Sequence, residues 1–96
     1  MKTNFTLLIA DRNPNVRTFL QREMTAAGYR TLLAENAREV IKLVFQGDTL
    51  DMIMLDPDLP DADETRMLEH LMDRIPVLPI VVHTYPYKAG QKKGNA

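Results

Sequence analysis

Short runs of apolar residues alternate along this chain with longer segments in which apolar residues recur every three or four positions. The runs cover residues 5–10, 29–34, 52–55 and 77–82, and apolar side chains dominate each of them. Nearly continuous apolar runs of this length are typical of strands that are covered on both faces of a sheet. The pattern therefore predicts four strands.

The segments between the runs have helical spacing and recognisable helix ends. In the first segment Pro14 suits the opening turn of a helix, and Gly28 closes the element. In the second segment Asn36 is a candidate N-cap, with Glu39 three positions later. A third segment repeats the spacing with methionine and leucine. We predict helices within residues 14–28, 36–47 and 64–74.

The order of these elements indicates the fold class. Strands that alternate with helices imply right-handed crossovers, a parallel sheet, and helices on both faces of that sheet. We expect a single α/β domain over residues 1–86, because a chain of 96 residues holds one hydrophobic core. Residues 87–96 contain lysine, glycine and polar side chains without periodicity, so we expect a flexible tail.

Composition and charge narrow the possible partners. A net charge of -1 provides no broad positive field, so we expect neither a nucleic-acid partner nor a membrane surface. The sequence has no cysteine, which excludes disulfides and thiolate metal sites and favours a cytoplasmic location. No apolar stretch approaches the ~20 residues that a membrane span requires.

Candidate chemistry gathers where the predicted strands end. Asp11 follows the first strand, Asp56 and Asp58 follow the third, and Thr84 follows the fourth. In a parallel sheet these positions share one edge, at which ligands of such folds bind. Two carboxylates and a loop carbonyl form an all-oxygen site that suits Mg²⁺, with room for a phosphoryl group beside it.

Three motifs in this order and spacing resemble a known family. Residues 8–17 read LIADRNPNVR, residues 51–60 read DMIMLDPDLP, and residues 79–84 read PIVVHT. From Leu7 to about Thr84 the chain resembles the receiver domain of bacterial two-component response regulators. The resemblance implies a flavodoxin-like (CheY-like) three-layer α/β/α fold, of which this chain contains about four strands, in the order 2-1-3-4, and three helices.

The same resemblance implies a role for each site residue. Asp56 is the expected phosphoryl acceptor, and a histidine kinase or a phosphotransfer protein is the expected donor. Asp11, Asp56 and the backbone carbonyl of Asp58 are the expected Mg²⁺ ligands, and Thr84 is expected to contact the phosphoryl oxygens. We expect a signalling module rather than an enzyme, with at most phosphorylation and dephosphorylation of Asp56 itself.

Two residues beside the site depart from the family pattern. Arg12 stands where the family has a second acid, so we expect weaker metal binding. An arginine at this position can neutralise a phosphoryl group or pair with Asp56. Tyr85 stands where the family has a small residue next to the hydroxyl of Thr84, and we expect its ring to cover the entrance to the site.

The family continues beyond the fourth strand with a further helix, strand and helix that have no counterpart in this sequence. One of those elements carries a lysine that contacts the phosphoryl group. Without these elements we expect the fourth strand to be an apolar edge, which proteins seldom leave unpaired. We therefore expect self-association or a partner at Val77, Ile80 and Val82.

Two other functions remain open from the sequence. A degenerate pseudo-receiver works through protein contacts alone and is never phosphorylated, and Arg12, Tyr85 and the missing lysine favour this alternative. A less favoured alternative is a phosphatase related to the haloacid dehalogenases, because Asp56, Asp58 and Thr84 weakly resemble the motifs of that family.

Overall fold

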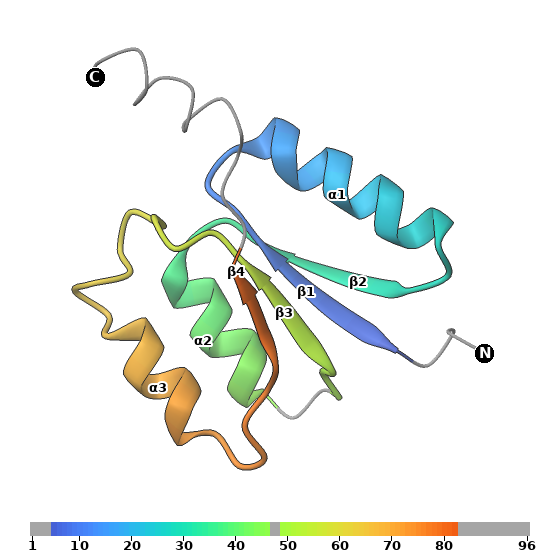
Figure 1. The fold of residues 1–96 in the computed structure, drawn as a ribbon. Coiled ribbons are helices and arrows are strands. Elements are labelled where there is room, and N and C mark those ends of the chain that lie inside the picture. Colours follow the sequence, from blue (N-terminus) through green and yellow to red (C-terminus); the bar gives the residue numbers. More distant parts are fainter. Residues whose placement is uncertain (1–4, 47–48, 83–96) are drawn as a thin grey trace, which may run out of the picture.

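The computed structural model describes residues 5–46 and 49–82. Three helices and four strands alternate along this part of the chain (Figure 1). The elements are β1 (Thr6–Ala10), α1 (Pro14–Ala26), β2 (Arg30–Ala34), α2 (Ala37–Phe45), β3 (Met52–Leu55), α3 (Met67–Asp73) and β4 (Ile80–Val82).

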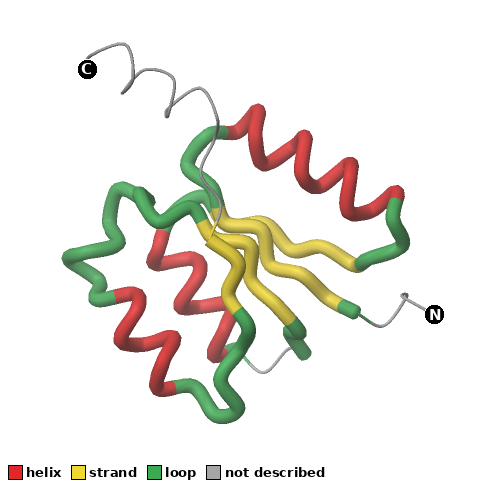
Figure 2. The backbone as a smooth tube through the Cα atoms, viewed as in Figure 1, coloured by secondary structure: helices red, strands yellow, loops and turns green. Residues whose placement is uncertain are grey.

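All the strands join one parallel sheet in the order β2-β1-β3-β4. Figure 1 shows α1 on one face of the sheet, and α2 with α3 on the other face. These are the three layers, the strand order and the alternation predicted from the sequence. The loops that follow β1 and β3 leave the sheet at the same edge (Figure 2), as parallel strands require.

Local signals explain where the first two helices begin. The side chain of Asn13 accepts hydrogen bonds from the backbone N–H groups of Asn15 and Val16, and Pro14 occupies the first turn of α1. The side chain of Asn36 caps α2 by accepting from the N–H of Glu39 at 2.9 Å. Both helix starts lie within a residue of their predicted positions.

The hydrophobic core lies between the two central strands and the pair of helices α2 and α3. Its members are fully or almost fully buried, and burial of a large aliphatic side chain contributes roughly 1.5–3 kcal/mol to stability. From the strands come Leu8, Ala10, Ile53 and Leu55, and from the helices come Val40, Val44, Met67 and Leu71.

Helix α3 begins later than the spacing predicts. It starts at Met67 rather than near Glu64, because Arg66 adopts the left-handed conformation with φ 55°. The hydroxyl of Thr65 donates to the backbone carbonyls of Asp61 and Ala62, which keeps the preceding residues in turns.

Strand β4 is shorter than predicted. It covers Ile80–Val82 instead of the whole run 77–82, and Val77 lies in the loop before it. Pro76 and Pro79 flank that loop, and proline has no N–H to donate to a neighbouring strand. The sequence prediction that Val77 belongs to the edge strand is therefore wrong.

No helix within residues 5–46 and 49–82 combines the length and the apolar character needed to cross a membrane.

Candidate functional site

Asp11 and Asp56 come together at the ends of the two central strands. In the pairing of β1 with β3, Ala10 lies opposite Leu55, so the residue after each strand reaches the same edge of the sheet. The backbone N–H of Asp56 donates to the carbonyl of Ala10 at 2.9 Å. Both aspartates are buried, with exposed fractions of 5% for Asp11 and 3% for Asp56.

The Asp56 carboxylate is held by donors from two loops. Its Oδ1 accepts from the backbone N–H of Asp58 at 2.9 Å, and its Oδ2 accepts from the backbone N–H of Arg12 at 3.2 Å. The guanidinium Nε of Arg12 lies 3.6 Å from the same Oδ2. A buried carboxylate is costly unless it is paired and hydrogen-bonded, and these contacts meet both conditions.

Arg12 also binds the next acid along the loop. Its Nη1 donates to the backbone carbonyl of Asp58 at 2.9 Å, and its Nη2 lies 3.7 Å from the Asp58 carboxylate. One guanidinium therefore joins the loop after β1 to the loop after β3 through three oxygen atoms. The Arg12 side chain keeps 38% of its surface exposed, so this bridge lies at the surface of the protein.

Asp11 organises the start of α1. Its Oδ1 accepts from the backbone N–H of Asn13 at 2.8 Å, and its backbone carbonyl accepts from Nη1 of Arg17 at 2.8 Å. Arg17 also forms an ion pair with Glu35, with 3.5 Å between Nη2 and Oε1. The buried position of Asp11 thus also serves to order the turn between β1 and α1.

The residues at this edge do not fit a divalent metal in the arrangement that they adopt. The carboxylate of Asp56 and the carbonyl of Asp58, two of the expected ligands, both contact the Arg12 guanidinium. Across the described part of the chain, no three acidic, histidine or cysteine side chains converge in a way that could hold a metal ion. We therefore derive no step through Mg²⁺.

The predicted site residues separate into two sets. The structure brings Asp11, Arg12, Asp56 and Asp58 into one cluster. Thr84 and Tyr85 lie outside the described residues, so their roles at the phosphoryl group and at the entrance stay predictions. The chemical roles of the clustered residues are likewise expectations from the resemblance.

Asp61 is an acid beside the site that the sequence did not single out. Its carboxylate accepts from the N–H groups of Ala37 and Arg38, at 2.6 and 3.0 Å, and so caps the start of α2. Burial raises the pKa of Asp61, but hydrogen bonds from backbone N–H groups and the charge of Arg38 lower it more, to below the ordinary 3.8. The partners lie 24 residues apart in sequence, so no local pattern marks this contact.

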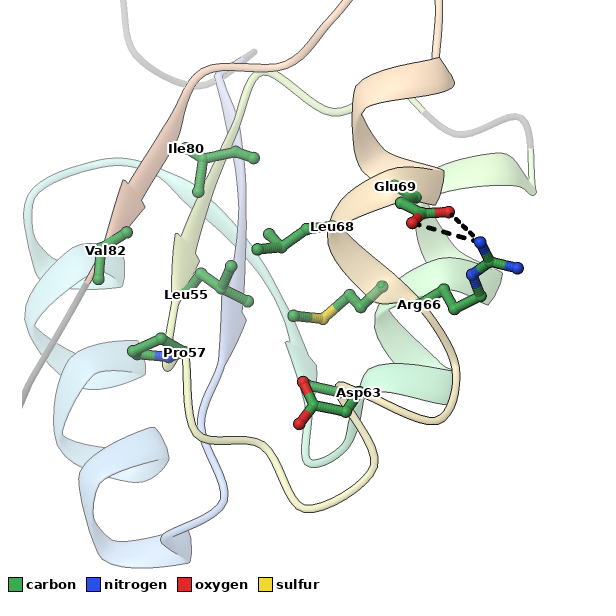
Figure 3. Close-up of a pocket in the computed structure, with 10 residues that line it drawn as sticks. Leu55, Pro57, Asp63, Arg66, Leu68, Glu69, Ile80 and Val82 are labelled. Atoms are coloured by element: carbon green, nitrogen blue, oxygen red, sulfur yellow. Dashed lines mark hydrogen bonds and ion pairs between the residues drawn. The ribbon is translucent and has the colours of Figure 1, made fainter.

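The other expected region is the edge at β4, which lies open. Ile80 is half-buried against the core, whereas Val82 is 60% exposed. Both line a groove of about 440 Å³ between β4 and α3 (Figure 3). Leu55 and Leu68 extend its apolar lining, and Asp63, Arg66 and Glu69 add charged groups to it. The predicted partner or self-association at this edge stays a prediction.

The family model for the response regulator receiver domain matches residues 7–93. The chain is 31% identical over 77 residues to the DNA-binding transcriptional regulator NtrC of Bradyrhizobium sp. (strain RP501 Parasponia), which covers 80% of this chain. The chain spans only 16% of the length of that relative.

Solved structures show the same fold. The beryllofluoride-activated NtrC receiver domain is 24% identical, has a TM-score of 0.68, and matches over 98% of this chain and 77% of its own. A second match is a complex of the histidine kinase ThkA with the response regulator protein TrrA. It has 21% identity and a TM-score of 0.62, and the match covers 95% of this chain and 96% of the matched chain.

Proposed function

The chain belongs to the family of response regulator receiver domains, and on that premise we propose that Asp56 accepts a phosphoryl group from a histidine kinase. The family works as a signalling module rather than as an enzyme with an external substrate. In this proposal the phosphorylation of Asp56 is the signal, and the kinase is the partner that phosphorylates it. The histidine kinase bound to TrrA in the matched complex supports this choice of partner.

The observation that carries the proposal is the position of the Asp56 carboxylate. It lies at the carboxyl end of a central strand, beside Asp11, where parallel sheets bind their ligands. Backbone N–H groups of Asp58 and Arg12 hold its two oxygens in place. A carboxylate fixed in this way presents a defined oxygen to an incoming phosphorus atom, which reduces the entropy cost of the reaction.

The transfer requires no redox partner. The phosphorus–nitrogen bond of the kinase phosphohistidine breaks, and its electron pair returns to the imidazole nitrogen. A phosphorus–oxygen bond forms to Asp56 and gives an acyl phosphate. The side chain then carries about one additional negative charge, which is the kind of local change that shifts a bistable surface.

A small phosphodonor tests the proposal without a known kinase. Incubation with phosphoramidate in a buffer that contains Mg²⁺ is expected to add one phosphoryl group to the wild-type protein, measured by intact mass. Asp56→Asn is expected to remove this gain. Asp63→Asn is the matched control, because it changes an exposed acid of the same loop. An unmodified wild type, or a gain that persists in Asp56→Asn, would contradict the proposal.

One observation favours the pseudo-receiver as a second candidate function. The guanidinium of Arg12 already pairs with Asp56, and the Asp56 side chain is only 4% exposed. In that function the ion pair substitutes permanently for the modification, and the domain acts through protein contacts. The phosphoramidate experiment separates the two, since a pseudo-receiver gains no mass while it stays folded.

A further inference from the structure

We propose that Arg12 is the resident cation of the Asp56 site and that its guanidinium takes the place of a divalent metal beside the phosphoryl group. The part that concerns the phosphoryl group rests on the proposed function of Asp56. The exclusion of the metal rests on the geometry of the unmodified site alone.

Arg12 contacts the oxygens that a metal ion at this site would need. Its three guanidinium nitrogens reach the Asp56 carboxylate, the Asp58 carbonyl and the Asp58 carboxylate, at 3.6, 2.9 and 3.7 Å. A bound Mg²⁺ would need such oxygens at about 2.0–2.1 Å, in near-octahedral geometry. Because the guanidinium stands between the same oxygens, metal and arginine compete for one position.

Charge leads to the same conclusion. Asp56 is buried and requires a positive partner, which Arg12 supplies from within the chain. A divalent ion placed beside this guanidinium meets like-charge repulsion in a partly buried setting, where screening by water is weak. The guanidinium is also part of the chain, so a chelator that removes a metal ion leaves this cation in place.

The shape of the guanidinium also fits a phosphoryl group. A guanidinium presents paired N–H donors that match two phosphoryl oxygens, which a point-charge ammonium does not. The Arg12 side chain is 38% exposed, so its head group has room to move from the carboxylates toward an incoming phosphoryl group. The backbone N–H of Arg12 already binds Asp56, which keeps the side chain beside the reacting oxygen.

Titration with Mg²⁺ alone tests the exclusion of the metal, with backbone amide NMR signals as the readout. In the wild type the amides of Arg12, Asp56 and Asp58 are expected to stay in place at millimolar Mg²⁺. In Arg12→Asp, which exchanges the guanidinium for an oxygen ligand, the same amides are expected to shift and saturate. Arg22→Asp is the matched control, because it makes the same charge change within α1, about 12 Å along the helix from Pro14.

Two outcomes would overturn the proposal. One is a wild type whose amides shift and saturate at the same Mg²⁺ concentration as those of Arg12→Asp. The other is a folded Arg12→Asp that ignores Mg²⁺, because the arginine is then not what excludes the metal. Arg12→Asn, which also adds an oxygen ligand, replaces Arg12→Asp if the latter has lost its dispersed spectrum. No phosphoryl donor is present, so the result is independent of whether Asp56 is ever phosphorylated.

Discussion

The two neighbouring strands β3 and β4 end in regions of opposite character. Asp56, directly after β3, is buried and held by Arg12 and by the loop backbone. Val82, which pairs with Leu55 at the end of β4, is exposed on the apolar side of an open groove. Charged groups in the first region find their partners within the chain, whereas apolar groups in the second face solvent in the described structure.

The comparison indicates what each region contributes. Closed polar contacts fix the geometry of a site and satisfy the charges that are buried there. Apolar side chains stabilise the fold only where they are buried. We therefore expect stability to fall sharply when the buried Leu55 of β3 is truncated, and hardly at all when the exposed Val82 of β4 is truncated.

The largest expected effect follows truncation of the core next to the site. Leu55→Ala removes a side chain that is 1% exposed, and we expect the free energy of unfolding to fall by about 2–5 kcal/mol. Urea denaturation followed by circular dichroism measures this change. A loss near zero would show that the end of β3 is not packed as the structure describes.

A smaller effect is expected at the contact between the loop after β3 and α2. Asp61→Ala leaves the first N–H groups of α2 without their acceptor, and we expect a cost of about 0.5–2 kcal/mol, by analogy with helix caps. Asp63→Ala, on the same loop, is the matched control. Equal stability of the two variants would contradict the capping role of Asp61.

The same residue gives the stability of the protein a predictable dependence on pH. The pKa of Asp61 is lower in the folded chain than its ordinary 3.8, because its hydrogen bonds and Arg38 outweigh burial, which raises it. Its contribution is therefore fully present above pH 3.8 and is lost as the pH falls through the folded pKa. The stability difference between wild type and Asp61→Asn should shrink on acidification below that value. A stability difference that grows below pH 3.8 would show that folding raises the pKa of Asp61 instead of lowering it.

The smallest effect is expected on the open side of the comparison. Val82→Ala shortens a side chain that is already 60% exposed, so we expect the free energy of unfolding to change by less than about 0.5 kcal/mol. Urea denaturation followed by circular dichroism, as for Leu55→Ala, measures this change in the free energy of unfolding. A cost similar to that of Leu55→Ala would show that Val82 is covered in solution, and the two ends would then no longer differ.

The sequence predicts this fold well where the signals are local. The apolar run 52–55 coincides with β3, and Asn36 caps α2 as the sequence predicts. Two elements begin later than the apolar pattern predicts. Helix α3 is delayed by the left-handed Arg66, and β4 is delayed by the prolines near Val77.

The candidate site can be predicted from the sequence only in part, and the reason differs from that for the fold. Strand order alone brings Asp11 beside Asp56, so an α/β pattern suffices to place them at one edge. The hydrogen bond from Arg12 to the carbonyl of Asp58 joins residues 46 positions apart in sequence. The hydrogen bond by which Asp61 caps α2 joins residues 24 positions apart. Such contacts depend on the path of each loop in space, which hydrophobic periodicity does not encode.

The most direct test of the whole account is the metal dependence of phosphorylation at Asp56. The measurement is the phosphorylated fraction of the wild type after reaction with phosphoramidate, by intact mass, once with Mg²⁺ and once with EDTA. Because Arg12 supplies the cation, we predict the same fraction in both buffers, and a fraction that requires Mg²⁺ in Arg12→Asp. Loss of wild-type modification in EDTA would contradict the role of Arg12, and its absence from both buffers would contradict the role of Asp56.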